Sequence, residues 1–116
     1  MKIELQVVAD CTHEAPTAQL LRRALDDVGL PTTRFTTVVV TGHEHAEQLR
    51  FTGSPTIRID GVDPFADPAW LPQLACRVYR TATGLSGTPD LAALRRFLKQ
   101  AADQGVVGGP PVTKDR

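Results

Sequence analysis

Cys11 is the residue of this 116-residue chain best suited to reactive chemistry. It follows a segment in which Ile3, Leu5 and Val7 alternate with polar residues, and it precedes a segment with helical periodicity, so it lies between a predicted strand and a predicted helix. The N–H groups and the dipole at a helix N-terminus favour the thiolate, which is the reactive form of cysteine. The sequence therefore makes Cys11 a candidate nucleophile.

Glu14 and His13 are the candidate helpers of Cys11. Glu14 could act as a general acid or base beside the thiol, or it could be a first-turn carboxylate favoured by the helix dipole. Pro16 suits a first helical turn, so the helix is expected to begin near Glu14 and to leave Cys11 slightly before it. Glu14 also stands where Cys-x-x-Cys chemistry would need a second cysteine. Exchange through Cys11 alone would need glutathione or a partner thiol to resolve the mixed disulfide.

Cys76 is the only other cysteine, and it could resolve such a mixed disulfide. A disulfide requires Cα atoms within about 7 Å of each other. If a strand over residues 75–80 runs toward the site, Cys76 stops roughly 10–13 Å short of the edge. We therefore expect a buried, small apolar thiol on a central strand.

Histidines near Cys11 raise the question of a metal site for zinc, copper or mercury. His13 follows the first strand, and His43 and His45 follow the second. Residues two apart cannot share a helix face, so His43 and His45 are expected to be solvated loop and cap residues. No metal site and no cofactor are predicted, and Cys11 and Cys76 remain only weak candidates for holding an ion.

The pattern of apolar residues predicts alternating strands and helices. Thr41 and Glu44 form a plausible capping box for the second helix. Phe65 and Trp70 are expected to close an irregular loop at 62–73 over the core. Strands are expected at residues 2–9, 34–40, 55–60 and 75–80, and helices from near Glu14 to Val28, at 42–50 and at 89–104.

This β-α-β-α-β-β-α order predicts an α/β fold of the minimal thioredoxin-like plan, with a four-stranded mixed sheet flanked by helices. Residues 1–104 would form one domain, and 105–116 a disordered tail. In that plan the first two strands end, and the third begins, at one edge. Cys11 and the stretch Ser54-Pro55-Thr56 should therefore meet there, in the usual place for a ligand.

Three stretches of the chain resemble short bacterial thioredoxin-like proteins, which are often labelled thioredoxin-family or alkylmercury-lyase-like. They are DCTHEAP at residues 10–16, FTGSPTIRIDGVDPF at 51–65 and LACRVYR at 74–80, within a likeness that covers roughly residues 3–100. The resemblance implies a cis-proline at Pro55. Ser54 would then offer its backbone groups to an extended substrate, and Thr56 completes the substrate-binding stretch.

Family members often carry Cys-Pro-Asn followed by Cys or Glu at the first of these stretches. This chain has Thr12, His13 and Glu14 after Cys11, so it resembles the one-cysteine variants. The alkylmercury label implies organomercurial cleavage with paired cysteines and an acid.

Composition excludes several classes of protein. Thirteen basic residues balance thirteen acidic ones, so nothing favours binding to nucleic acid or to an anionic membrane. No run approaches the ~20 apolar residues of a membrane span, and the first residues lack a secretory signal pattern. We therefore expect a cytoplasmic protein.

The leading hypothesis is monothiol exchange or thiol-ligand binding by Cys11 opposite a cis-Pro55, with an unknown thiol, small molecule or protein as partner. The alternatives are a non-catalytic binding domain, and metal or organomercurial handling through Cys11 and Cys76.

Overall fold

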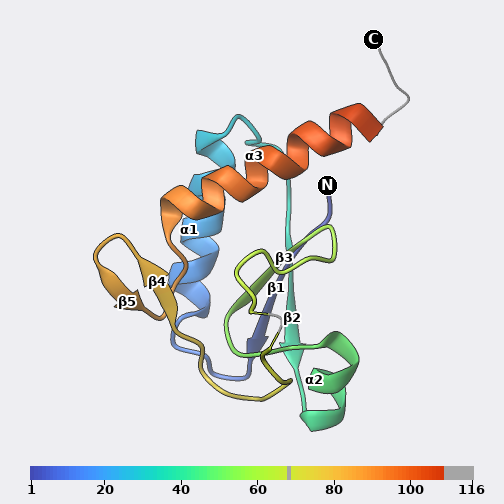
Figure 1. The fold of residues 1–116 in the computed structure, drawn as a ribbon, viewed down its shortest axis with the longest axis vertical. Coiled ribbons are helices and arrows are strands. Elements are labelled where there is room, and N and C mark those ends of the chain that lie inside the picture. Colours follow the sequence, from blue (N-terminus) through green and yellow to red (C-terminus); the bar gives the residue numbers. More distant parts are fainter. Residues whose placement is uncertain (68, 109–116) are drawn as a thin grey trace.

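The central strand is β1 (Ile3–Val8), in a computed structural model that describes residues 1–67 and 69–108 (Figure 1). It pairs in parallel with β2 (Thr36–Val40) and antiparallel with β3 (Thr56–Ile59), which gives a mixed sheet in the order β2-β1-β3. Within the described residues three helices accompany this sheet: α1 (Glu14–Asp27), α2 (His43–Leu49) and α3 (Leu91–Gly108). The predicted α/β class is confirmed.

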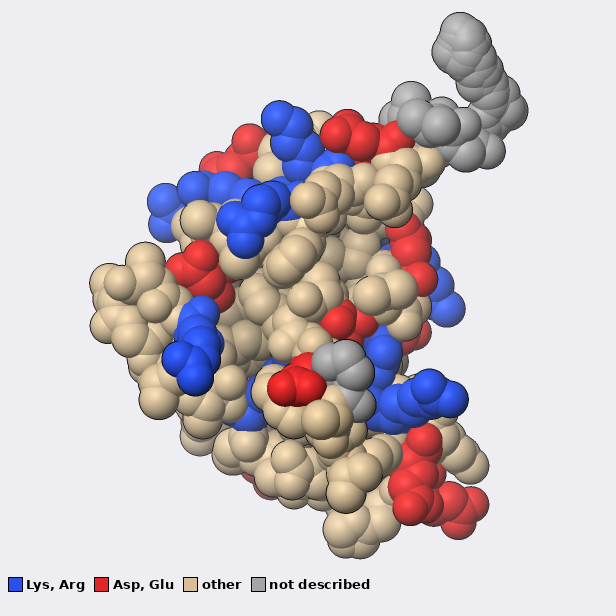
Figure 2. All heavy atoms as spheres, viewed as in Figure 1, with Lys and Arg blue, Asp and Glu red and all other residues tan. Residues whose placement is uncertain are grey.

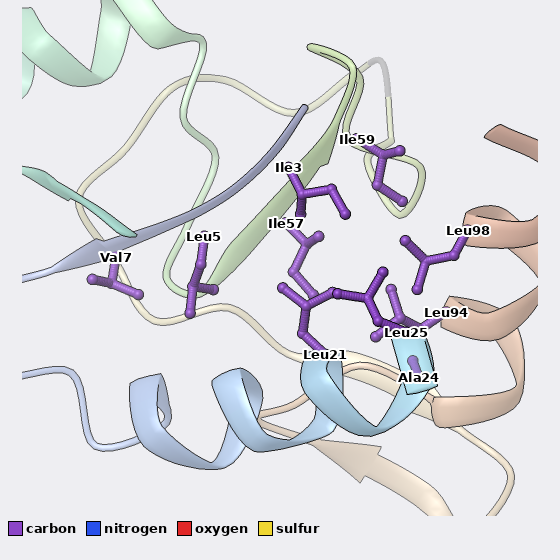
Figure 3. Packing of buried hydrophobic residues seen from close by; sticks show 10 residues of the cluster. All are labelled: Ile3, Leu5, Val7, Leu21, Ala24, Leu25, Ile57, Ile59, Leu94 and Leu98. Atoms are coloured by element: carbon purple, nitrogen blue, oxygen red, sulfur yellow. The ribbon is translucent and has the colours of Figure 1, made fainter. Parts of the chain in front are cut away.

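The main core lies between one face of the sheet and the helices α1 and α3. Alternate residues of β1 and β3 point toward these helices, as the period-2 pattern of a half-buried strand requires (Figure 3). The helices contribute residues three or four apart, which form one apolar stripe on each helix. The buried residues of this core are Ile3, Leu5, Val7, Leu21, Ala24, Leu25, Ile57, Ile59, Leu94 and Leu98.

A second, smaller core forms under α2. Val40 at the end of β2 and Ala46 on α2 are buried together with Phe51, and Val8 and Leu74 pack against them. Phe51 is fully buried and also accepts a hydrogen bond on its carbonyl oxygen from the N–H of Gln73. The segment around residues 73–74 is thereby held beside the chain that leads into β3.

The predicted fourth strand does not join this sheet. Instead, β4 (Tyr79–Thr81) pairs antiparallel with β5 (Gly84–Ser86) in a separate two-stranded hairpin. Residues 75–77 make their backbone hydrogen bonds with Ser54, so they are not available to pair with β3. The prediction of four strands in one sheet is therefore wrong for the described residues, and residues 84–86, where no helix or strand was expected, form a strand.

The helix termini agree with the sequence only in part. α1 begins at Glu14 as predicted. The capping box of α2 is wrong, because Gly42 is the N-cap and no side chain caps it. At α3 the Asp90 carboxylate accepts the N–H of Ala93. The α3 backbone continues to Gly108, into the predicted tail, and the remainder of that tail at 109–116 lies outside the described residues.

Candidate functional site

Cys11 lies in the turn between β1 and α1. Its thiol is free and half-buried, and the residue packs against the main core. Its carbonyl oxygen accepts the N–H of Glu14, the first residue of α1, at 3.2 Å. Cys11 therefore precedes the helix by a turn, as Pro16 suggests, and the helix dipole acts on it from farther away than on a first-turn residue.

The stretch Ser54-Pro55-Thr56 begins β3 at the same edge of the sheet. The Ser54–Pro55 peptide bond is cis, as predicted. Ser54 is buried, and its Oγ accepts the N–H of Val8, the last residue of β1, at 3.1 Å. Thr56 Oγ1 donates to the Gly53 carbonyl at 2.6 Å. This stretch is thus bonded directly to the strand that leads to Cys11.

Residues 73–77 run alongside this stretch and occupy its backbone groups. The N–H of Ser54 donates to the Ala75 carbonyl at 2.8 Å, and the N–H of Arg77 donates to the Ser54 carbonyl at 2.9 Å. These two bonds form a parallel bridge between Ser54 and Cys76. The backbone N–H and carbonyl of Ser54, which an extended substrate was expected to use, therefore both have partners within the chain.

Gly53 allows this close approach of the two segments. A Cβ at Gly53 would lie 2.9 Å from Cβ of Arg77 and 3.4 Å from the Ala75 carbonyl oxygen. Gly53 also has a φ of 143°, which residues with a side chain rarely adopt. Glycine is thus required here for both space and backbone conformation.

Cys76 lies elsewhere than predicted. It is exposed rather than buried, and it sits opposite Ser54 rather than within a central strand. The sequence placed it by assuming that residues 75–80 form one strand ending at the site. The strand begins only at Tyr79, so Cys76 is already at the edge where β3 begins.

A buried ion pair that was not expected from the sequence anchors residue 77. The Arg77 and Asp63 side chains are 2% and 4% exposed, and Nη1 of Arg77 lies 2.6 Å from Oδ2 of Asp63. Nη1 also donates to Thr56 Oγ1 at 3.1 Å. The guanidinium stands 5.0 Å from the centre of the Trp70 ring. An arginine in a segment expected to be buried was the available signal, because a buried arginine needs a carboxylate.

Tyr79 supports the same turn from the side of the main core. Its hydroxyl donates to the Pro55 carbonyl, and its ring makes an edge-to-face contact with Phe65. Burial raises the pKa of this hydroxyl above its ordinary value, with Arg77 lowering it and Asp63 raising it to smaller extents. Phe65 in turn contacts Phe97 of α3, so it closes the loop over the core as expected. Trp70 differs, since it is 41% exposed.

The histidines are dispersed. The His13 ring packs against Gly87, where an added Cβ would lie 2.4 Å from Nε2. His45 accepts the N–H of Thr41 on Nδ1, and His43 is the exposed first residue of α2. In the described part of the chain, no group of three or more His, Cys, Asp or Glu side chains could hold a metal ion.

The surface next to Cys76 is slightly hollowed. A depression of about 240 Å³ is lined by Thr52, Trp70, Gln73, Cys76, Arg77 and Val78. On the face shown in Figure 2, acidic and basic side chains are scattered around a largely uncharged central area. Across residues 1–67 and 69–108, no helix combines the length and apolar character needed to cross a membrane.

The site thus contains two free thiols: Cys11, three residues after the Val8 that bonds Ser54, and Cys76, which is bridged to Ser54. The chemistry available to these thiols is nucleophilic attack by sulfur, with Asp10 and Glu14 as the carboxylates nearest to Cys11 in the sequence. No protein-family model matches the chain, and no curated protein or solved structure was found that matches it.

Proposed function

We propose that the chain is a thioredoxin-like protein in which Cys11 is a single reactive thiol that exchanges with, or binds, a small thiol compound. The observation that carries the proposal is the hydrogen bond from the N–H of Val8 to Ser54 Oγ at 3.1 Å. It ties the strand that leads to Cys11 to the turn before Pro55. The parallel β1–β2 and antiparallel β1–β3 pairings support the same plan.

Exchange would begin with the Cys11 thiolate attacking one sulfur of a small disulfide. A bond then forms between Cys11 and that sulfur, and the other half leaves as a thiolate, which takes up a proton from water. Because Glu14 replaces the second cysteine of a Cys-x-x-Cys pair, the mixed disulfide must be resolved by a thiol from elsewhere.

A small partner fits this site better than an extended peptide. A peptide added along the turn at Ser54 would need its N–H and carbonyl groups, and Ala75 and Arg77 already occupy them. The Arg77–Asp63 ion pair holds this segment in place, and removing a partner from such a buried pair costs about 3–5 kcal/mol. We therefore propose a low-molecular-weight thiol or disulfide, of which glutathione is a suitable probe.

The test is the reaction of the reduced protein with oxidised glutathione. The reaction is monitored by measuring the glutathione thiol that is released and the intact mass of the protein. We expect the wild type and Cys76→Ser to form the first mixed disulfide equally fast, and faster than N-acetylcysteine at the same pH. In Cys11→Ser this fast phase should be lost. If Cys11 reacts no faster than N-acetylcysteine, thiol exchange is excluded.

A non-catalytic binding domain is the second candidate function. It is favoured by the internal occupation of the Ser54 backbone groups and by Glu14 in the place of a second thiol. This candidate requires that Cys11→Ser leaves binding of the partner unchanged, whereas the exchange proposal requires that the reaction with glutathione disulfide disappears.

A further inference from the structure

We propose that Cys76 is the resolving thiol for Cys11, so that the two cysteines form an internal disulfide during exchange; this rests on the proposed function. Cys76 is exposed, carries a free thiol and is placed by two backbone hydrogen bonds between its neighbours and Ser54. The chain contains no third cysteine. The thiol that the first motif lacks would thus come from a segment 65 residues later.

Both cysteines are connected to Ser54 by short paths. Ser54 Oγ bonds the N–H of Val8, and Cys11 follows Val8 by three residues. On its other side Ser54 is bridged to Cys76, and paired strands lie about 4.8 Å apart. The segments that carry the two cysteines therefore meet at the edge where β1 ends and β3 begins.

The segment that carries Cys76 is held firmly. Successive side chains of an extended segment point to opposite sides, and Arg77 points inward to Asp63. Cys76, its neighbour, therefore points away from that buried pair, and it is exposed. Gln73 adds a hydrogen bond from its N–H to the Phe51 carbonyl at 2.9 Å. A thiol positioned in this way acts at a high effective concentration toward a disulfide at the same edge.

The reaction balances with one small disulfide as oxidant. The Cys11 thiolate attacks glutathione disulfide, forming the Cys11–glutathione bond and releasing one glutathione thiolate. The Cys76 thiolate then attacks the Cys11 sulfur, the Cys11–Cys76 bond forms, and the second glutathione leaves as a thiolate. Two protein thiols are oxidised and one disulfide is reduced, and the two protons from the cysteines are taken up by the two glutathione thiolates.

The experiment treats reduced wild-type protein and Cys76→Ser with oxidised glutathione, stops the reaction with an alkylating agent, and identifies the disulfides by peptide mapping. We expect the wild type to release two glutathiones and to form the Cys11–Cys76 bond. Cys76→Ser should stop at the Cys11–glutathione mixed disulfide, with release of the second glutathione at least about 10-fold slower.

A matched control moves the thiol along the same segment. Val78 is also exposed, and it is two residues beyond the bridge to Ser54. The double variant Cys76→Ser with Val78→Cys keeps an exposed thiol about 6.6 Å farther along an extended chain. We expect this variant to behave like Cys76→Ser.

Each result bears on one of the two proposals. If Cys11 forms the mixed disulfide but the wild type and Cys76→Ser both stop there, the role of Cys76 is refuted and the single-thiol function stands. Resolution by Val78→Cys as fast as by Cys76 would also refute it, because placement would then not matter. If Cys11 does not react in any variant, both proposals fail.

Discussion

Replacing Asp63 with asparagine should lower the free energy of unfolding by about 3–5 kcal/mol, because it leaves the buried Arg77 guanidinium without its counter-charge. Asparagine has nearly the same shape as aspartate. It can still accept the N–H of Phe65 on Oδ1, a hydrogen bond of 3.0 Å. The substitution therefore removes the charge while keeping the turn that begins at residue 63.

The size of this effect follows from the burial of the pair. Both side chains are less than 5% exposed, so water cannot replace the lost carboxylate. Since about 1.4 kcal/mol corresponds to a factor of ten, the folded-to-unfolded ratio should fall by roughly 100- to 4,000-fold. Domains of this size are stable by about 5–15 kcal/mol, so the variant should remain folded but lose a large part of its stability.

The appropriate assay is urea unfolding monitored by tryptophan fluorescence. Trp70 is the only tryptophan, and its ring lies 5.0 Å from the Arg77 guanidinium, so the signal comes from the region that is changed. The control is Asp26→Asn, which removes a half-exposed partner of Arg22 and should cost less than about 1 kcal/mol. Adding Arg77→Met to Asp63→Asn should restore part of the stability, because no charge is then left buried.

Two results would contradict a stabilising role of the Arg77–Asp63 pair. If Asp63→Asn costs no more than Asp26→Asn, the Arg77–Asp63 pair does not hold the segment at residues 75–77. If the double variant is as unstable as the sum of the two single changes, the two side chains are not energetically coupled.

The remaining predictions concern the turn at Ser54. In the same urea assay, Gly53→Ala should destabilise the protein by about 1–3 kcal/mol more than Gly61→Ala. Both glycines have positive φ, but only a Cβ at Gly53 would meet Arg77. Equal losses of stability in the two variants would contradict the close approach of Gly53 to Arg77. Tyr79 is the only tyrosine, so phenolate absorbance reports it alone. Because burial raises its pKa in the folded state, its contribution to stability is complete below about pH 10 and is lost as the pH rises above that value. We expect no phenolate signal near pH ~10 until the chain unfolds, and a shallower loss of stability at alkaline pH in Tyr79→Phe; ordinary titration of folded wild type would contradict this.

The order of the early elements could be read from the sequence because it depends on local patterns. Alternation at Ile3, Leu5 and Val7 identified β1, and Pro16 placed the start of α1 near Glu14. The shared edge of β1 and β3 followed from topology, since a strand that runs the opposite way must begin where its neighbour ends. Cys11 and Ser54 could therefore be assigned to one edge without a structure.

Only the tertiary structure decided what lies beside Ser54. The residue types at 75–80 indicate an extended segment, but they do not identify its partner, because several edges can satisfy the same backbone groups. The choice depended on contacts distant in sequence: the space left by Gly53, and the pairing of Arg77 with Asp63. Because of these contacts, Cys76 lies at the edge where β3 begins and not in the interior of a strand. The same contacts occupy the backbone groups of Ser54 that a peptide substrate would have used.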